Sequence, residues 1–351
     1  MGRAPSAPVR NAVAVTLKPG NTALPPLFVI ASSGGTLGAY DRLSKALRTD
    51  REVVGIRDPF IWGERDPTGG FQDWISIYLA AMRQRQPQGP YFICAFSSAG
   101  AFAYELARRL RREGEAVARL ILVDPIGIAG EAQADFGYRA FAAMFRGRRS
   151  KWLVRMAGWW RYLSGCGPRE SARAGDNDFR MDAAEFGRRA AAVRQDRKIM
   201  KDLSSLFELN TGLPFTMTDS DFAGRHPGEY LETFLARVRS VTPEVDPATV
   251  ERILVQYYCL QLPATHFYRL TSYDGRVDLF EPRSEQVGLL AAYFRPYVRD
   301  LGLRVLEIAP PSPRTEFVCA NLGRSLRTHY RSMRDEAFVA NLAAAMDRML
   351  T

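Results

Sequence analysis

The sequence has few of the residues that bind metals or form disulfides. Its 351 residues include only four cysteines and three histidines. The cysteines are Cys94, Cys166, Cys259 and Cys319. None belongs to a C-x-x-C pair, and no histidine lies near one of them at the spacing of a metal site. We therefore expect neither a disulfide framework nor a zinc site, and no metal in the functional site.

Long apolar runs are also missing. No stretch approaches the roughly 20 residues that span a bilayer, and the opening residues MGRAPSAPVRN lack the apolar core of a secretory signal. We therefore expect no membrane span and a cytoplasmic location. With 46% hydrophobic and 25% charged residues, the composition is typical of a soluble globular protein that can bury a large core.

The positive charge of the chain is concentrated in one region. Residues 139–201 contain 16 Lys and Arg against 6 Asp and Glu, an excess equal to the net charge of +10 for the whole chain. Such a region could bind an acidic protein, a nucleic acid or an anionic membrane, or it could be an Arg-rich solvated surface. No zinc-finger, RNA-recognition or helix-turn-helix signature accompanies it, so we expect no nucleic-acid partner.

In the first third of the chain, apolar runs that predict strands alternate with amphipathic segments that predict helices. The predicted strands are 11–17, 26–31, 51–56, 91–95 and 118–124, and the predicted helices are 38–48, 71–86 and 99–113. Strands that alternate with helices of this length indicate a mostly parallel sheet covered by helices on both faces. The fold class predicted is therefore α/β.

The alternation stops after residue 127 and resumes near residue 275. Residues 128–274 read as helical segments separated by Gly, Pro and Asp, without a clear strand. Beyond them the sequence predicts strands at 276–281 and 303–309 and helices at 284–302 and 334–350. We therefore expect one core, built from residues 1–127 and 275–351, with a large helical insertion at 128–274.

Two adjacent serines, in the segment AFSSAG, lie where a predicted strand turns into a predicted helix. A nucleophilic serine on such a turn crowds the residues two positions before and after it, and these are usually glycine. For Ser97 they are Ala95 and Ala99, whereas for Ser98 one of them would be Phe96. Ser97 is therefore the better nucleophile, and the N–H of Ser98 would donate to the oxyanion. The alternative is that both serines only cap the helix.

The surroundings of Ser97 contain the other groups that a serine hydrolase needs. The loop SSGG after strand 26–31 could supply a second oxyanion N–H. Asp124 ends a buried strand, and His329 stands just before the last predicted helix. The order serine, acid, histidine is the one expected of an α/β-hydrolase.

Rival residues exist for both partners of the serine. Glu281 comes directly after RVDLF, at the end of the strand predicted at 276–281, where many α/β-hydrolases place their acid. His226 and His266 are the other histidines, and both lie in the insertion. A lone histidine there is more often a surface or core residue than a base.

The block PLFVIASSGG…LGAY…VVGIRDP…GPYFICAFSSAGAFAYELARRL…LILVDP resembles the type I thioesterase domains that release products from polyketide and nonribosomal peptide synthases. The likeness covers about the first 125 residues and returns weakly in THYRSM. It implies an α/β-hydrolase fold in which the insertion forms a lid. It also implies a triad of Ser97, Asp124 and His329, with oxyanion N–H groups from Ser33 and Ser98. The connection at 310–327 is longer than the family usually has.

The resemblance also implies an activity. A serine-dependent thioesterase of this kind releases an acyl, polyketide or peptidyl chain by hydrolysis, cyclisation or transfer through an acyl-enzyme. The substrate arrives on the phosphopantetheine arm of an acyl or peptidyl carrier protein, so no cofactor of the enzyme's own is expected. Two alternatives stay open: an esterase or lipase for free small-molecule esters, and a non-catalytic hydrolase-fold binding protein, which Ala31, Ala95 and Ala99 suggest.

Overall fold

The computed structural model describes residues 13–62, 70–125, 179–284, 287–320 and 324–351. Within them, seven strands form one sheet in the order β1-β3-β2-β4-β5-β6-β7. The strands are β1 (Ala14–Lys18), β2 (Leu27–Ile30), β3 (Val53–Ile56), β4 (Tyr91–Phe96), β5 (Val117–Val123), β6 (Tyr273–Pro282) and β7 (Val298–Leu306). Only β1 is antiparallel to its neighbour, so the mostly parallel sheet predicted from the sequence is confirmed.

The central strands bury both of their faces. In β2, Leu27 and Val29 pack into one hydrophobic cluster, whereas Phe28 and Ile30 pack into another. All four side chains are at most 1% exposed. Because successive side chains of a strand point to opposite faces, a strand buried on both sides must be apolar at every position. This explains why the sequence of β2 is an uninterrupted apolar run.

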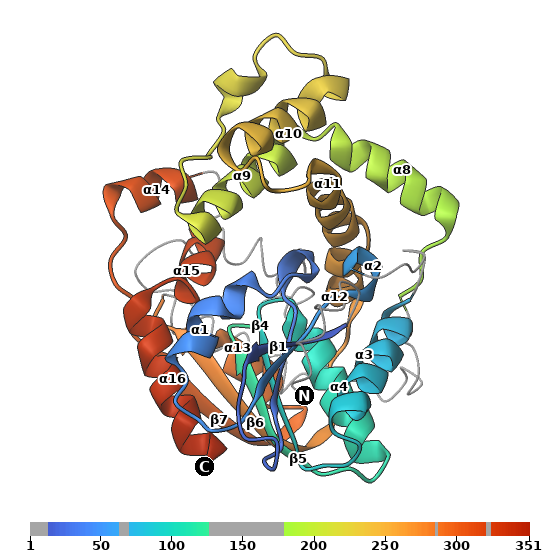
Figure 1. Ribbon diagram of the computed structural model, residues 1–351, viewed down its shortest axis with the longest axis vertical. Coiled ribbons are helices and arrows are strands. Elements are labelled where there is room, and N and C mark those ends of the chain that lie inside the picture. The colour runs from blue at the N-terminus through green and yellow to red at the C-terminus, as the bar shows by residue number, and fades with distance from the viewer. Residues whose placement is uncertain (1–12, 63–69, 126–178, 285–286, 321–323) are drawn as a thin grey trace, which may run out of the picture.

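Helices cover both faces of the sheet (Figure 1). One face packs against α1 (Asp41–Ala46) and α16 (Glu336–Leu350). The other packs against α3 (Phe71–Arg85), α4 (Ala99–Arg112) and α13 (Leu289–Phe294). The predicted two-sided α/β architecture is thus present, with the core divided between the two faces.

The chain between β5 and β6 forms a set of helices that we call the helical insertion. Its described elements are α8 (Ala183–Arg194), α9 (Arg197–Thr211), α10 (Tyr230–Val241), α11 (Pro247–Gln256), a π-helical turn (Tyr257–Gln261) and α12 (Leu262–Phe267). Figure 1 shows α8 to α11 gathered beyond one end of the sheet. Residues 179–272 contain no strand, as predicted. The predicted boundary at 127/128 lies outside the described residues.

Aspartates begin three of the described helices of the insertion. Asp182, Asp196 and Asp246 each precede a helix and accept a hydrogen bond from a backbone N–H of its first turn. A side-chain oxygen at this position satisfies an N–H that has no acceptor within the helix. Pro247 follows Asp246 at the first helical position, where its missing N–H is harmless. The Asp and Pro breaks seen in the sequence are therefore helix starts.

The helix predicted at 284–302 is wrong in its second half. α13 ends at Phe294, and β7 already begins at Val298, five positions before the predicted strand. Asp300 of β7 lies opposite Arg276 of β6 in the parallel register, and the Arg276 guanidinium donates to it at 3.3 Å. Pairing with β6 is a long-range contact, and it overrides the local helical pattern of this segment.

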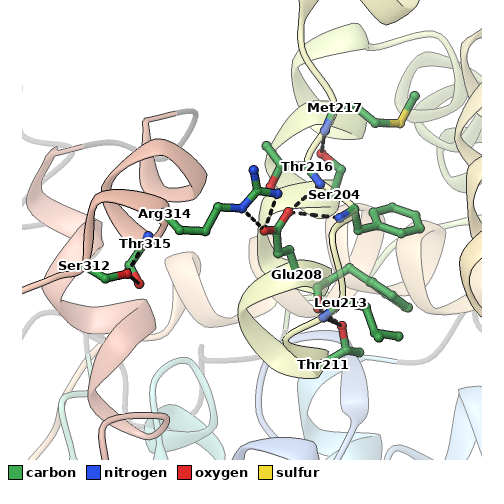
Figure 2. Close-up of polar contacts among 11 residues, drawn as sticks. Ser204, Glu208, Thr211, Leu213, Thr216, Met217, Ser312, Arg314 and Thr315 are labelled. Carbon is green, nitrogen blue, oxygen red and sulfur yellow. Dashed lines mark hydrogen bonds and ion pairs between the residues drawn. The ribbon is translucent and has the colours of Figure 1, made fainter.

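Two short helices, α14 (Pro313–Cys319) and α15 (Arg324–Ser332), connect β7 to α16. α14 lies beside α9 of the helical insertion (Figure 1). In Figure 2 the Arg314 guanidinium of α14 reaches the Glu208 carboxylate of α9, with Nε to Oε1 at 2.6 Å. The second oxygen of Glu208 accepts the backbone N–H groups of Phe215 and Thr216. The long connection thus docks on the insertion. No helix within the described ranges is long and apolar enough to cross a membrane.

Candidate active site

Ser97 lies on the turn between β4 and α4. Its φ of +61° is in the left-handed region, which costs a residue other than glycine about 1–2 kcal/mol. The turn is held by backbone hydrogen bonds: the Ser97 N–H donates to the Val123 carbonyl of β5 at 3.1 Å, and the Ser97 carbonyl accepts from Gly100 at 3.0 Å. Strained backbone held in this way often accompanies function.

Alanine occupies the two positions at this turn where glycine is usual. Ala95 is the second-last residue of β4 and Ala99 is the first residue of α4, and neither has exposed surface. The side chain of Ser98 makes no capping hydrogen bond, and its Oγ has no hydrogen-bond partner among the described residues. A capping role for the Ser98 hydroxyl is therefore not supported. The turn accommodates both methyl groups and still leaves Ser97 in its strained conformation.

His329 brings Ser97 and Asp124 together. Its Nε2 lies 2.8 Å from Ser97 Oγ, and its Nδ1 lies 2.8 Å from Asp124 Oδ2. Ser97 lies on the turn before α4, Asp124 directly after β5 and His329 in the last turn of α15. Each of the three residues is at most 7% exposed. The three triad candidates from the sequence are thus one continuous hydrogen-bonded chain.

Neighbouring groups hold the imidazole in this orientation. The ring of Phe96, the residue before Ser97, stacks on the His329 ring at 4.8 Å with 15° between the planes. The Ser332 hydroxyl donates to the His329 carbonyl at 2.8 Å. With Asp124 accepting from Nδ1, Nε2 is left to accept the Ser97 proton.

Asp124 is the second residue of the site with strained backbone. Its φ is +43°, and its N–H donates to the Phe280 carbonyl of β6 at 2.8 Å. The residue therefore turns away from the strand direction of β5 immediately after Val123. Two of the three side chains in the chain thus stand on left-handed backbone at the carboxyl end of neighbouring strands, the edge where parallel sheets build their sites.

The rival acid, Glu281, has another role in the structure. Its two carboxylate oxygens accept the backbone N–H groups of Gly288 at 2.7 Å and of Ala291 at 3.2 Å. The carboxylate therefore caps the start of α13. Burial raises the pKa of Glu281, and the nearby Asp124 contributes to the rise. It is Asp124, not Glu281, that hydrogen-bonds His329.

The two rival histidines lie in the insertion. His226 is exposed and begins the short turn Pro227–Glu229, where its Nδ1 accepts the Gly228 N–H. His226 thus has a local structural role at the surface. The backbone of His266 belongs to α12, and its side chain lies outside what the structure describes.

The loop that holds Ser33 follows β2, the strand beside β4, and so lies next to the turn at Ser97. β2 and β4 pair in parallel with Ile30 opposite Ala95, so Ser33 and Ser98 each stand three positions beyond a paired residue at the same sheet edge. The Tyr40 hydroxyl connects the two strands, because it donates to the Ile30 carbonyl and accepts the Phe96 N–H, each at 2.7 Å. Burial raises the pKa of Tyr40 well above its ordinary value, so this donor stays protonated.

The insertion contacts the same loop through Gln261. The Gln261 Nε2 donates to the Ser32 carbonyl at 3.1 Å, and Oε1 accepts the Gly34 N–H at 2.9 Å. Gln261 has no exposed surface. Neither Gln261 nor Tyr40 was predicted from the sequence. A single glutamine in a helical stretch carries no signal for a partner more than 200 positions away.

No metal site accompanies these residues. Nowhere in the described ranges do three His, Cys, Asp or Glu side chains gather as they would around a metal ion.

Residues 25–151, which include Ser97 and Asp124, match the model of the thioesterase domain family. Over this segment the chain is similar to thioesterase domains. Over 127 residues it is 35% identical to a non-reducing polyketide synthase, atnG, of Arthrinium sp, an alignment of 35% of this chain and 6% of that protein. Over 105 residues it is 35% identical to the bikaverin polyketide synthase bik1 of Gibberella fujikuroi, covering 29% and 5%. The chain thus matches only about a twentieth of the length of these synthases.

Solved structures of thioesterase domains share the fold across the chain. A four-domain nonribosomal peptide synthetase bound to AMP and glycine superposes on 96% of this chain, and on 20% of its own, with a TM-score of 0.62 and 19% identity. The Vlm2 thioesterase domain bound with a dodecadepsipeptide gives a TM-score of 0.51 at 14% identity, covering 97% and 98%. The resemblance to thioesterase domains and the α/β-hydrolase fold are therefore both confirmed.

Proposed function

We propose that this protein is a serine thioesterase that releases an acyl, polyketide or peptidyl chain from a carrier protein through an acyl-enzyme on Ser97. The observation that carries the proposal is the chain of two 2.8 Å contacts from Ser97 through His329 to Asp124. A hydroxyl, an imidazole and a carboxylate in this order activate a serine for attack on an acyl group. The similarity to thioesterase domains suggests a thioester as the substrate.

In the first half-reaction, Ser97 Oγ attacks the thioester carbonyl while His329 Nε2 takes the hydroxyl proton. Asp124 keeps the Nδ1 proton directed at itself and stabilises the imidazolium. The tetrahedral oxyanion binds the N–H groups of Ser98 and Ser33, each worth on the order of 3 kcal/mol. The carbon–sulfur bond then breaks, and the thiolate of the phosphopantetheine arm leaves with the proton from His329.

In the second half-reaction, His329 takes a proton from the incoming nucleophile as it attacks the Ser97 ester. Collapse of the second oxyanion breaks the bond to Oγ, which recovers its proton from His329. Water yields an acid, an internal hydroxyl or amine yields a ring, and an external amine or alcohol yields an amide or ester.

The domain arrangement follows from the same proposal. Residues 1–127 and 275–351 form the hydrolase core, and residues 128–274 form a lid. The buried contact of Gln261 with the Ser33 loop supports a lid that reaches the site. No cofactor of the enzyme's own takes part, because the proposed chemistry uses only the side chains of the chain and the carrier's arm.

The acyl or peptidyl carrier protein is the proposed partner. Much of the basic region 139–201 lies outside the described residues. In its described part, basic side chains pair with acids of the insertion: Arg188 and Arg189 with Glu185, and Lys201 with Asp219. The unbalanced charge therefore belongs mainly to residues 139–178, where it would attract an acidic carrier. We place the reaction in the cytoplasm, which the buried thiols of Cys94 and Cys259 suit.

A serine-reactive fluorophosphonate and a pair of serine variants test the proposal. We expect the probe to label Ser97, and Ser97→Ala to abolish both labelling and turnover. Ser98→Ala should keep much of the activity because a main-chain donor survives a side-chain change. Unlabelled Ser97, or equal loss in both variants, would refute the assignment.

A comparison of substrates tests the carrier. The same acyl group is offered on a phosphopantetheinylated carrier protein, as a small free thioester and as a free ester. We expect the highest kcat/KM on the carrier, with an advantage that shrinks as salt screens the charges. A preference for the free ester would instead identify an esterase.

A further inference from the structure

Gln261 contacts the peptide groups on both sides of Ser33. Its amide nitrogen donates to the Ser32 carbonyl and its amide oxygen accepts the Gly34 N–H. The carbonyl of Ser32 and the N–H of Ser33 belong to one planar peptide group and point in opposite directions. A bond that fixes the Ser32 carbonyl therefore fixes the direction of the Ser33 N–H, and directs it away from Gln261.

The loop alone does not settle this orientation. Within the loop, the Ser32 carbonyl also accepts the Gly35 N–H at 2.8 Å, which closes a tight turn. Gly34 and Gly35, with φ of +76° and +65°, give this turn the backbone freedom of glycine. A loop with two such residues has several accessible conformations. An external contact that is specific for one of them stabilises it, and Gln261 is such a contact.

The insertion is built to bring Gln261 to the loop. The residue ends the π-helical turn Tyr257–Gln261, a one-turn widening of the helix that shifts the following side chains around its axis. Ile253 of α11 packs so closely that a Cβ at Gly34 would lie 2.9 Å from its side chain. With the amide completely buried, both of its hydrogen bonds form without competition from water.

We propose that Gln261 is a positioning residue that orients the Ser33 N–H toward the oxyanion, so that the helical insertion completes the active site. The inference rests on the proposed thioesterase function. Glutamine suits the role because one side chain offers a donor for the Ser32 carbonyl and an acceptor for the Gly34 N–H. A carboxylate lacks the donor, and an apolar side chain lacks both.

Gln261→Met tests the inference, since it keeps the length of the side chain and removes both hydrogen bonds. Removal of an oxyanion donor typically lowers kcat by about 10²–10³. For a donor that is misdirected rather than removed, we expect kcat to fall by about 10- to 100-fold with KM changed less than about 2-fold. The inhibition constant of a trifluoromethyl ketone, which forms a tetrahedral oxyanion on Ser97, should rise by the same factor as kcat falls.

Gln256→Met is the matched control. Gln256 is a buried glutamine of the same insertion, 4% exposed, whose side chain lies beside Asp58 and makes neither of the hydrogen bonds that Gln261 forms to Ser32 and Gly34. It should keep kcat and the ketone constant of the parent. If Gln261→Met does not fold, Gln261→Glu at pH 8 is the second variant. It has the same size and keeps an acceptor for Gly34, but its carboxylate offers Ser32 no donor, so it should show the same loss.

These variants distinguish a failure of the positioning role from a failure of the proposed function. Folded Gln261 variants with the parent's kcat and ketone constant would overturn the positioning role while Ser97→Ala remained inactive. Turnover in Ser97→Ala would overturn the proposed function itself. A ketone constant that rises together with a loss of kcat in Gln256→Met would also count against Gln261, because it would reveal a general effect of disturbing the insertion.

Discussion

Ser97 and His329 are held by different kinds of contact. Ser97 and Asp124 follow directly on buried strands, and backbone hydrogen bonds to the neighbouring strand fix both. His329 arrives on α15, after a connection whose helix α14 is tied to the insertion by Arg314 and Glu208 (Figure 2). The sheet therefore places two members of the site, whereas side-chain contacts between distant segments place the third.

Because of this difference, Ser97 and Asp124 are fixed more rigidly than His329. A residue at the end of a central strand cannot move without disturbing the sheet, because protein cores are closely packed. α15 lies outside the sheet and follows α14, which an ion pair ties to the insertion, so α15 can shift at lower cost. The histidine is the member of the site that movement of the insertion would affect most.

The largest expected effect comes from the histidine itself. His329→Ala should lower kcat by about 10⁵–10⁶, since the serine loses its base and the leaving group its acid. His226→Ala should leave kcat unchanged, because this side chain only begins an exposed turn. Steady-state kinetics on a thioester measure both. Near-normal turnover in His329→Ala would show that the base lies on another residue.

The second effect concerns the choice between the two acids. Asp124→Asn should lower kcat by about 10⁴, because an amide no longer holds the imidazole in the reactive tautomer. Glu281→Gln should change kcat only a few-fold while it destabilises the fold, as one of the oxygens that cap α13 is replaced. Kinetics and thermal melting of both variants decide the assignment. The reverse pattern would make Glu281 the acid.

A third effect concerns the stability of the fold around Asp58, which follows β3 and contacts the loop that holds Ser33. Asp58 is completely buried beside Gly35, its Oδ1 accepts the Phe60 N–H, and the side chains of Trp74 and Gln256 lie beside its carboxylate. Burial raises the pKa of Asp58 to about 6. Since an unfolded aspartate has a pKa near 3.9, the folded state binds the extra proton between about pH 4 and 6, and its stability falls as pH rises through that window.

Asp58→Asn removes this titration and keeps an acceptor for Phe60. The variant should gain little relative to the parent at pH 4 and on the order of 2 to 3 kcal/mol in free energy of unfolding above pH 6. Urea denaturation at pH 4 and pH 8 measures the difference. An advantage that is equal at both values would mean that Asp58 does not titrate in this range.

The smallest effect concerns the contact of the insertion with α14, which precedes the helix of His329. Arg314→Ala should lower the free energy of unfolding by about 1–2 kcal/mol, because Glu208 loses its charged donor, and should lower kcat a few-fold through α15. Arg283→Ala is the matched control: its pair with Glu307 is exposed on both sides and should contribute less than about 1 kcal/mol. An unchanged kcat in Arg314→Ala would show that the insertion does not influence His329.

The sequence predicted the parts of the molecule that depend on local pattern. The strand β2 could be predicted because burial on both faces allows only apolar residues. The turn at Ser97 could be predicted because a tight strand-to-helix turn allows only small residues around the serine. For Asp124 the residues alone left one rival and for His329 two, and the resemblance to thioesterases chose among them.

The features that escaped prediction all depend on contacts between distant segments. The start of β7 was read as helix because its partner, β6, is invisible to a local pattern. The pair of Arg314 and Glu208 joins residues 106 positions apart, and Gln261 reaches the Ser32 carbonyl across 229 positions. Nothing in the periodicity of either segment records such a partner.

The separation of Ser97 and His329 by 232 positions also has a kinetic consequence. Contacts between such distant segments form late in folding, because the loop between them must close first. The strands around Ser97 can pair before the insertion and the last helices have docked. During refolding, the recovery of thioesterase activity should therefore lag behind the recovery of the far-ultraviolet circular-dichroism signal. The appearance of turnover would mark the completion of the fold.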